Sequence, residues 1–469
     1  MIDRRQFIVT AAIGGLAAGC TQVGPRLAPP PPAADGLVTE LQRRSFQFFW
    51  DTTDPKTGLA PDRWPTPSFA SIAAVGFALT AYPIGVVNGW ITRDQARART
   101  LTTLQFFADA PQGDSQSSHS GYRGFFYHFL GTTRGHRFAR CELSTVDTAL
   151  LLGGILFAQS WFDGDHPDEA RIRDLADRIY AAVDWTWITP RAPFVSMGWH
   201  PESGFIPHDW NIYNEAMLLY VLALGSPTHP LPAGTWDAVS ARFDAQWTDR
   251  WGEPYLHYGP LFVHQYSHCW IDFRGIRDRY MADRDIDYFE NSRRAVQAQR
   301  AYAVANPGGW AGYDEDVWGL TACDGPGDFK ASLAGREREF FSYSARGPGD
   351  RDDGTIAPTA AAASIAFEPE LATAAIEAMH RRYGRGIWGQ YGFLDSFNPT
   401  LTEAPEPLRH GRIVPGIGWV DSDYLGIDQG PIVAMIENAR SGLVWNTMAR
   451  NPHIRRGLAR AGFTGGWLT

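Results

Sequence analysis

Two kinds of helical segment alternate from Gly36 to the end of the chain, and this alternation restricts the fold more than any other feature. One kind is amphipathic, with apolar residues at helical spacing on one side, and covers residues 36–51, 92–108, 167–186, 234–247, 284–305 and 369–383. The other kind is apolar on nearly every side and covers residues 69–82, 144–162, 214–225, 262–273, 358–367 and 430–436. A helix that is apolar all round must be buried all round, whereas an amphipathic helix buries only one face.

Six fully buried helices and six half-buried helices predict an all-α fold, the (α/α)6 toroid. In this double ring, six inner helices are enclosed by six outer ones, and the inner helices run parallel, so that their N-termini open on one face. The long loops are rich in Pro, Gly and Trp and span residues 111–140, 187–209, 306–357 and 384–429. Loops of this length are seldom simple connectors, so we expect them to form the walls of a cleft on that face.

The N-terminus is expected to direct export rather than to belong to the fold. Residues 1–20 contain Arg4-Arg5-Gln6-Phe7-Ile8 and end with LAAGC at Cys20, which resembles a twin-arginine signal joined to a lipoprotein cleavage box. Residues 21–35 are Pro-rich and predict an extended linker, which leaves 36–469 as a single catalytic domain. We therefore expect a periplasmic or outer-membrane-anchored lipoprotein, held at the membrane only by a lipid on Cys20.

Charge and cysteine usage narrow the class of partner. A formal net charge of −9 disfavours nucleic acid or an anionic membrane surface, so a neutral ligand fits better. Cys141, Cys269 and Cys323 form no disulfide framework and are expected to be buried thiols. His264 and His268 have the spacing of a metal-binding pair, but the general-base Glu of an HExxH motif is missing. We expect a monomer without a metal or a cofactor.

Acidic residues stand at the starts of three inner helices. Glu215 begins the third apolar segment, Glu142 and Asp147 flank the start of the second, and Asp428 precedes the last, where Pro431 suits the first helical position. Acids favour helix starts as caps or as partners of the helix dipole, so each one alone has a simple structural explanation. Three such starts on one face of a ring favour a functional explanation.

Facing carboxyl groups are what cleavage of a glycosidic bond requires, one as the acid and one as the base. Glu215 is surrounded by apolar residues, which favours a raised pKa and the role of general acid. Asp428 or Glu142 would be the base, directly or through a water or a substrate hydroxyl. Inverting hydrolysis would require a separation of about 6.5 to 9.5 Å between the carboxyl groups.

The loops also carry side chains suited to sugars. Aromatic candidates for packing against sugar rings are Trp64, Tyr122, Phe126, Tyr127, Trp199, Trp210, Trp270, Trp310, Trp318, Trp388, Tyr391 and Trp419. Polar candidates for bonding sugar hydroxyls are Arg123, His128, His208, His264, Gln265, Arg274, Asp324 and Asp421. From these and the acids we predict substrate contacts from Asp147, Tyr127, His208, Trp210, His264, Gln265, Trp270, Arg274, Trp318, Asp324, Trp419 and Asp421.

Several long motifs together resemble one known family. They are GFFYHFL, CELSTVDTALLLGG, GFIPHDWNIYNEAMLLYVLALGSPTHP, QYSHCWIDFRGIRD, DVWGLTACDGPG and WVDSDYLGIDQGPIVAMIENARSGLVW. The chain resembles the bacterial glucoamylase-like family, which overlaps the endo-β-1,2-glucanases of glycoside hydrolase family 144. The resemblance implies an (α/α)6 toroid that cleaves β-1,2-linked glucans with inversion, by endo or exo action. The acids in the matching motifs are Glu142, Asp147, Glu215, Asp324 and Asp428.

Other functions stay open at the level of the sequence. The enzyme could hydrolyse α-glucans, as the family's older name suggests, or the protein could be a surface glycan-binding lipoprotein without catalysis. A toroid lyase acting on uronates is disfavoured, because it would need Tyr, His and Arg rather than acids in the cleft.

Overall fold

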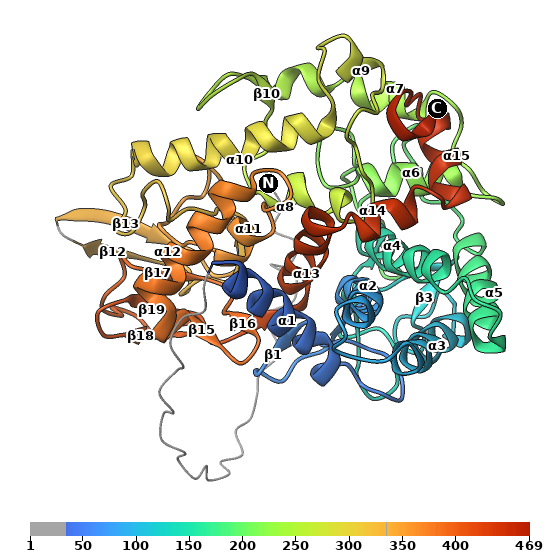
Figure 1. Ribbon diagram of the computed structural model, residues 1–469, viewed down its shortest axis with the longest axis horizontal. Helices are drawn as coiled ribbons and strands as arrows, with labels where there is room; N and C mark the ends of the chain where they lie inside the picture. The colour runs from blue at the N-terminus through green and yellow to red at the C-terminus, as the bar shows by residue number, and fades with distance from the viewer. Residues whose placement is uncertain (1–33, 334) are drawn as a thin grey trace.

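Helices that are buried on every side form an inner ring, as the sequence predicts. The structure is a computed structural model that describes residues 34–333 and 335–469 (Figure 1). The inner ring in this part of the chain consists of α2 (Ile72–Val87), α4 (Thr145–Trp161), α6 (Met217–Gly225), α8 (Phe262–Gln265) with the 3-10 turn η3 (Ser267–Cys269), α11 (Pro358–Ala362) and α13 (Gly426–Arg440). Nearly all of their residues are buried. The predicted (α/α)6 toroid is thus confirmed.

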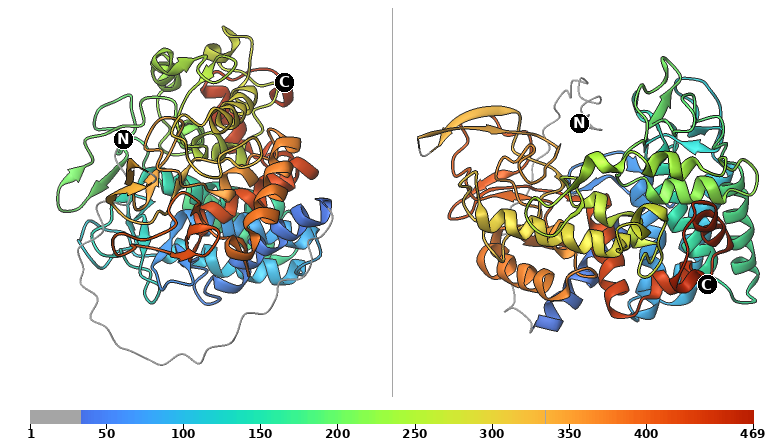
Figure 2. Two further views of the ribbon diagram at one scale, coloured as in Figure 1. Left: turned by 90° about the vertical axis from the view of Figure 1, so that its left-hand side faces the viewer. Right: turned by 90° about the horizontal axis from the view of Figure 1, so that it is seen from above.

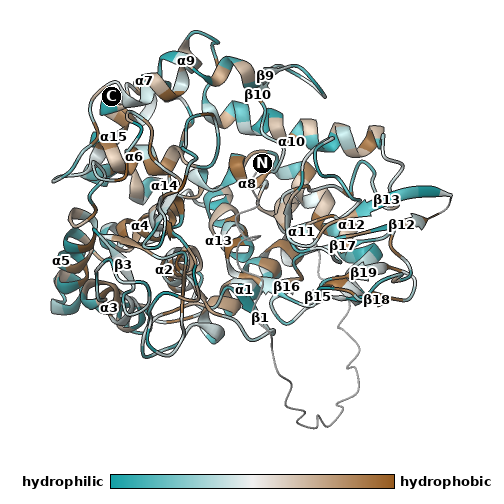
Figure 3. Ribbon diagram, turned by 180° about the vertical axis from the view of Figure 1, so that it is seen from behind, coloured by the Kyte–Doolittle hydropathy of each residue, from teal (hydrophilic) through white to brown (hydrophobic). Residues whose placement is uncertain are grey.

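Amphipathic helices form the outer ring. They are α1 (Ala34–Thr52), α3 (Arg93–Asp109), α5 (Pro167–Ala181), α7 (Thr235–Ser240) with η2 (Phe243–Gln246), α10 (Tyr288–Ala305) and α12 (Pro369–Ile387). Figure 3 shows the contrast, since α2 and α4 are mostly hydrophobic whereas α5 carries a hydrophilic face. Shorter helices that the sequence did not predict are α9 (Arg279–Ala282), α14 (Leu443–Met448), α15 (Pro452–Arg460) and η4 (Gly466–Leu468).

Short antiparallel strand pairs order the long loops. Those next to the inner helices are β1 (Arg63–Trp64) with β20 (Tyr424–Leu425), β2 (Ala70–Ser71) with β5 (Phe129–Leu130), and β6 (Leu143–Ser144) with β7 (Gly198–His200) and β8 (Gly204–Phe205). The others are β3 (Gly121–Tyr122) with β4 (Phe125–Phe126), β9 (Trp247–Thr248) with β10 (Tyr255–Leu256), β11 (Ala322–Cys323) with β14 (Ser344–Ala345), β12 (Phe329–Leu333) with β13 (Arg336–Phe340), β15 (Trp388–Gly389) with β16 (Gly392–Phe393), and β17 (Phe397–Asn398) with β19 (Gly418–Val420) and β18 (Arg412–Val414). Viewed from above, the hairpin β12–β13 and the green strands near residue 200 project from the same side (Figure 2).

Glycines let two inner helices touch backbone to backbone. A methyl group on Gly154 of α4 would overlap the carbonyl oxygen of Gly76 in α2, and one on Gly76 would overlap the carbonyl oxygen of Leu150. Gly430 of α13 leaves room in the same way for the ring of Phe77. These positions set how closely α2, α4 and α13 approach each other.

Side-chain hydrogen bonds close the rest of the ring. The backbone N–H of Leu218 in α6 donates to Oγ of Ser267 in η3 at 3.0 Å. Nε2 of Gln265 in α8 donates to the carbonyl oxygen of Ala360 in α11 at 2.8 Å, and Nδ2 of Asn438 in α13 donates to Cys269 O at 3.1 Å. These bonds join α6 and α13 to η3, and α8 to α11.

The centre of the ring is filled rather than hollow. The indole of Trp270 stacks on Phe77 with ring centroids 5.0 Å apart, and its Nε1 donates to Oγ1 of Thr80 at 3.0 Å. Gly153 leaves room for this indole. Trp270 therefore plugs the ring instead of facing a ligand.

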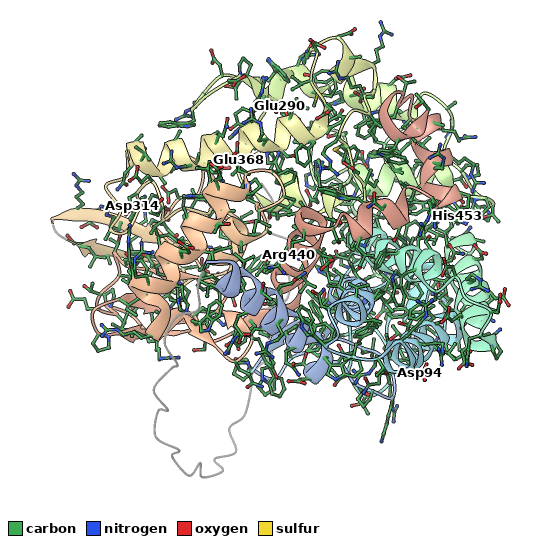
Figure 4. The ribbon with its side chains drawn as sticks, viewed as in Figure 1. Asp94, Glu290, Asp314, Glu368, Arg440 and His453 are labelled. Carbon is green, nitrogen blue, oxygen red and sulfur yellow. The ribbon has the colours of Figure 1, made fainter. Side chains whose placement is uncertain are left out.

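Ion pairs connect helices at the periphery. Arg293 of α10 pairs with Glu290 at 2.7 Å and with Glu368, just before α12, at 2.8 Å. Both acids are labelled in Figure 4. Arg440, in the last turn of α13, donates to Gln42 of α1 at 2.7 Å. These contacts tie the outer helices to one another and to the far end of α13.

The sequence misplaced the start of α13. The helix begins at Gly426, so Asp428 lies inside its first turn and Pro431 lies within the helix rather than at its first position. The pairing of β20 with β1 ends at Leu425, and the N–H of Gly426 donates to Asp62 O at 2.9 Å. The strand pairing therefore determines where the helix begins.

Other expectations meet the structure only in part. Cys141, Cys269 and Cys323 are free and buried, as predicted. The export signal at 1–20, its Cys20 and nearly all of the linker at 21–35 lie outside the described residues. No helix in the described part of the chain is both long enough and apolar enough to span a bilayer.

The contact between α2 and α4 predicts the effect of one added methyl group. Gly154→Ala should lower the free energy of unfolding by about 1 to 3 kcal/mol, because the helices must move apart to avoid the carbonyl oxygen of Gly76. Denaturant titration measures the change. Gly252→Ala is the control, since a methyl there meets no atom within 4 Å, and it should change stability by less than about 0.5 kcal/mol. Equal effects of both changes would contradict this account of the ring.

Candidate active site

The starts of α2, α4 and α13 lie on one rim of the ring. Each follows directly after a short strand: β2 before α2, β6 before α4, and β20 before α13. The N–H of Ile72 donates to His128 O at 3.3 Å, and the N–H of His128 donates to Glu142 O at 2.9 Å. Strand β1, which pairs with β20, begins directly after Asp62, whose N–H donates to Phe69 O just before β2. Backbone hydrogen bonds therefore link the three starts.

The start of α6 joins the same rim through Trp210. Nε1 of this indole donates to Oγ1 of Thr145, the first residue of α4, at 2.9 Å. The hydroxyl of Tyr220 in α6 donates to Trp210 O at 2.5 Å and accepts the N–H of Val195 at 3.2 Å. Trp210 is buried, so it positions the two helix starts and offers no open face to a sugar.

Glu142 and Asp147 flank one histidine at the start of α4. Nδ1 of His128 lies 2.7 Å from Oε1 of Glu142, and its Nε2 lies 3.5 Å from Oδ1 of Asp147. Ser144 caps the helix by accepting the N–H of Asp147, and its hydroxyl also donates to the Asp147 carboxylate. Asp147 is therefore a capping and bracing residue, whereas the Glu142 side chain keeps 13% of its surface exposed.

The surroundings of Glu142 favour its ionised form. Burial opposes ionisation, but the charge and the hydrogen bond of His128 outweigh it, and the pKa of Glu142 is lowered. A carboxylate that stays ionised suits the role of a base or of an acceptor for hydroxyl groups, and it does not suit the role of an acid.

Glu215 is held immediately before α6. Oδ1 of Asn214 accepts the N–H of Ala216 at 3.0 Å, and Glu215 O accepts the hydroxyl of Ser267 at 3.0 Å. The helix begins at Met217, so Glu215 stands in the preceding turn rather than in the helix as predicted. The residue is 4% exposed and is thus nearly enclosed.

Asp428 faces a group of acids that the loops bring to the start of α13. Its side chain forms a hydrogen bond with Asp395, whose Oδ2 accepts the N–H of Asp324 at 2.7 Å. Nη1 of Arg63 in β1 lies 2.5 Å from Oδ2 of Asp324. Asp421 completes the group, since one of its oxygens lies within 4.8 Å of an oxygen of Asp324 and of Asp395.

Burial affects the charge of this group. Burial first, and the charge of Asp324 second, raise the pKa of both Asp395 and Asp421. Asp324 and Asp421, both predicted to contact the substrate, are fully buried.

Four further side chains predicted to contact the substrate are buried in packing. Trp270 fills the centre of the ring and Gln265 links α8 to α11. The indole N–H of Trp419 donates to His410 O at 2.8 Å beneath the hairpin β12–β13, and Trp318 is likewise buried. Sequence alone cannot distinguish an aromatic residue in the core from one in a cleft.

Three more predicted contacts lie elsewhere or are blocked, and a fourth is open. His264 is buried, and its two ring nitrogens are hydrogen-bonded to the hydroxyl of Tyr213 and to the carbonyl oxygen of Tyr258. The predicted metal-binding partner, His268, is hydrogen-bonded to Ser292 instead. One face of the Tyr127 ring is covered by the guanidinium of Arg137 at 4.8 Å, and the residue is buried. Arg274 pairs with Asp272 and lies over Trp445 of α14, beyond the far end of α13. His208 is exposed and remains a candidate.

The structure also identifies residues that sequence analysis undervalued or missed. His128 was only one of several polar candidates, yet it lies between two acids. Trp64 is 43% exposed and pairs with Tyr424 immediately before α13, so it is the aromatic side chain best placed to pack on a sugar there. Arg63 and Asp395 carried no local signal, because their partners are more than 70 residues away.

Comparisons with known proteins agree with one another. The family model Glycoamylase, described as "Putative glucoamylase", matches residues 207–452, more than half of the chain. A crystal structure of a Bacteroides uniformis protein given the same description is 32% identical with a TM-score of 0.80, covering 94% of this chain and 100% of that one. An endo-β-1,2-glucanase from Chitinophaga pinensis is 27% identical with a TM-score of 0.77, covering 93% and 100%.

A curated relative is longer than this chain. The exo β-1,2-glucooligosaccharide sophorohydrolase of Parabacteroides distasonis is 27% identical over 463 residues. The match covers 92% of this chain but only 58% of that protein.

One buried ion pair supports the loop that carries Asp324. The guanidinium of Arg346 bonds both oxygens of Asp353 at 2.8 Å and donates to Cys323 O at 2.8 Å, and both side chains are fully buried. Arg346→Met should lower the free energy of unfolding by about 3 to 5 kcal/mol, because Asp353 loses its counter-charge inside the protein. Denaturant titration measures the loss.

The double variant Arg346→Met/Asp353→Leu tests the reason for that loss. It should be more stable than the single variant, because no unpaired charge stays buried. A double variant as unstable as the single one would show that packing rather than charge is responsible.

Proposed function

The chain belongs to the Glycoamylase family, and from this premise we propose that it is a glycoside hydrolase that cleaves β-1,2-linked glucan. Acids at the starts of α4, α6 and α13 carry the proposal, because one rim brings them together. The activities named for the Chitinophaga and Parabacteroides relatives support the linkage. The chain spans 58% of the Parabacteroides protein, so we extend only the linkage to this chain and leave endo or exo action to product analysis.

Glu215 is proposed as the general acid. Its side chain is nearly enclosed, just before α6 on the rim, where a general acid would be shielded from bulk water. Glu142 lies beside His128, which favours its ionised form. The two glutamates thus have different surroundings, as the division between acid and base requires.

Asp428 is proposed as the base that activates water by an inverting mechanism. It lies in the first turn of α13, next to Asp395. Glu142 would then accept a hydrogen bond from a hydroxyl group of the sugar, and Trp64 would pack on a sugar ring at the edge of the site. Inversion requires a water between the base and the sugar.

We also propose that the enzyme is an exported monomer tethered by a lipid on Cys20. The twin-arginine pattern and the LAAGC box support this proposal.

The role of Glu215 predicts a loss of turnover without a loss of fold. Glu215→Gln should lower kcat on β-1,2-glucan by about 10³-fold or more while the melting temperature stays near that of the wild type. Glu437→Gln is the matched control, since Glu437 is a buried acid near the opposite end of α13. Near-normal turnover of Glu215→Gln would remove this residue from the mechanism. If the wild-type enzyme cleaved only α-glucans, the alternative of an α-glucan hydrolase would be favoured.

The assignment of the base predicts different behaviour for two variants. Asp428→Asn should lose kcat by about 10³-fold and recover part of it with azide, forming a glycosyl azide, whereas Glu142→Gln should mainly raise KM without rescue. Proton NMR of the first product should show the inverted α-anomer. Azide rescue of Glu142→Gln instead would exchange the two roles, and a β-anomer would exclude inversion.

A further inference from the structure

Three loops bring three carboxyl groups together behind Asp428. Asp324 follows β11, Asp395 precedes β17, and Asp421 follows β19. One oxygen of each lies within 4.8 Å of one oxygen of each of the others, and all three residues are fully buried. This cluster of Asp324, Asp395 and Asp421 is here called the carboxylate triad.

Protein donors satisfy the carboxylate triad only in part. Arg63 pairs with Asp324, and the N–H of Asp324 donates to Oδ2 of Asp395. Among the described residues, neither oxygen of Asp421 nor Oδ1 of Asp395 accepts a hydrogen bond of normal geometry. The N–H of Ser422 lies near Asp421 but does not reach that geometry. A buried polar atom without a partner is costly, so Asp421 in particular calls for a ligand.

The charges around the carboxylate triad point to a cation. The triad carries up to three negative charges, and the guanidinium of Arg63 supplies one positive charge next to Asp324. Arg63 is shared with Asp62 at 3.3 Å and with Asp423 at 3.6 Å, so it cannot neutralise the triad. A divalent cation would supply the positive charge that Arg63 alone does not.

We propose that the carboxylate triad binds Ca²⁺. All three groups offer oxygen, which Ca²⁺ prefers. One oxygen of each group lies within 4.8 Å of the others, so a single ion with bonds of about 2.4 Å can reach all three. Mg²⁺ is less suited to such a site, because it demands a strict octahedron and usually keeps several waters.

A neighbouring group offers a different kind of site. Asp324, His410 and Asp423 also lie within 4.8 Å of one another, and the imidazole would favour a transition metal such as Zn²⁺. In that group Asp423 already accepts the N–H of Thr66 at 2.9 Å and His410 is partly exposed. The observations therefore favour Ca²⁺ at the carboxylate triad.

The proposed ion would join three loops at the start of α13. The N–H of Asp395 donates to Asp423 O at 2.9 Å, the N–H of Asp421 donates to Ser396 O at 3.0 Å, and Oγ of Ser396 donates to Asp324 O at 2.8 Å. These bonds hold the loops side by side, and Ca²⁺ would add side-chain bonds between the same segments. Its contribution to stability does not depend on which glycan the enzyme cleaves.

The test compares metal content and thermal stability of the full chain. After dialysis against Ca²⁺ and then against buffer treated to remove free metal, elemental analysis should find one Ca²⁺ per chain. Protein stripped with EDTA should melt several degrees lower and regain its melting temperature when CaCl₂ is added, because the ion binds only the folded state. No bound Ca²⁺ and no change in melting temperature would overturn the proposal and leave the triad held by protons.

Variants locate the ion. Asp421→Asn should abolish the Ca²⁺-dependent shift, whereas Asp352→Asn should lower the melting temperature but keep the shift. Asp352 is the matched control, because it is a carboxylate remote from the triad whose oxygens are bonded by Tyr302, Trp310 and Tyr313. His410→Ala should also keep the shift.

Other results would overturn the assignment. A shift that persists in Asp421→Asn would place the ion elsewhere, and a shift produced by Zn²⁺ and lost in His410→Ala would assign the neighbouring group instead. If Asp421→Asn does not fold, calorimetric titration of the stripped wild-type chain with CaCl₂ decides. These readouts do not involve glucan cleavage, so they stand apart from the test of Glu215.

Discussion

Close contact between inner helices is the constraint on which the rest of the structure depends. Gly76 and Gly154 allow α2 and α4 to meet backbone to backbone, and Gly430 lets α13 approach Phe77. The ring is tight enough for the indole of Trp270 to pack at its centre, against Phe77 and Thr80. A filled ring leaves chemistry only at its rim, where the helices start.

Acidic residues are common at helix starts, and the rim brings three of them together into a site. Glu142, Glu215 and Asp428 each stand near the start of a different inner helix, where acids are favoured. Short strands and the indole of Trp210 hold those starts together. The surroundings then separate the roles, because His128 favours the ionised form of Glu142 whereas Glu215 is enclosed and Asp428 shares a hydrogen bond with Asp395.

Most of the fold could be predicted, but only part of the site. The two classes of helix follow from which residues are apolar at helical spacing, and that pattern is local. The acids on the rim were found because a helix start is also a local feature. Trp270, Trp419, Gln265 and His264 were predicted to contact the substrate but are buried in packing, because the same residue types occur in a core and in a cleft. Only burial distinguishes the two.

The sequence by itself determined the double ring, the order of its helices and the acids near their starts, since each depends on neighbouring residues. Tertiary structure alone decided that α13 begins at Gly426, that His128 lies between Glu142 and Asp147, and that Arg63 meets Asp324. It also decided that Asp324, Asp395 and Asp421 meet. The physical reason is distance along the chain: hydrophobic periodicity acts over a few residues, whereas these carboxylates and their partners meet only after separate loops have packed.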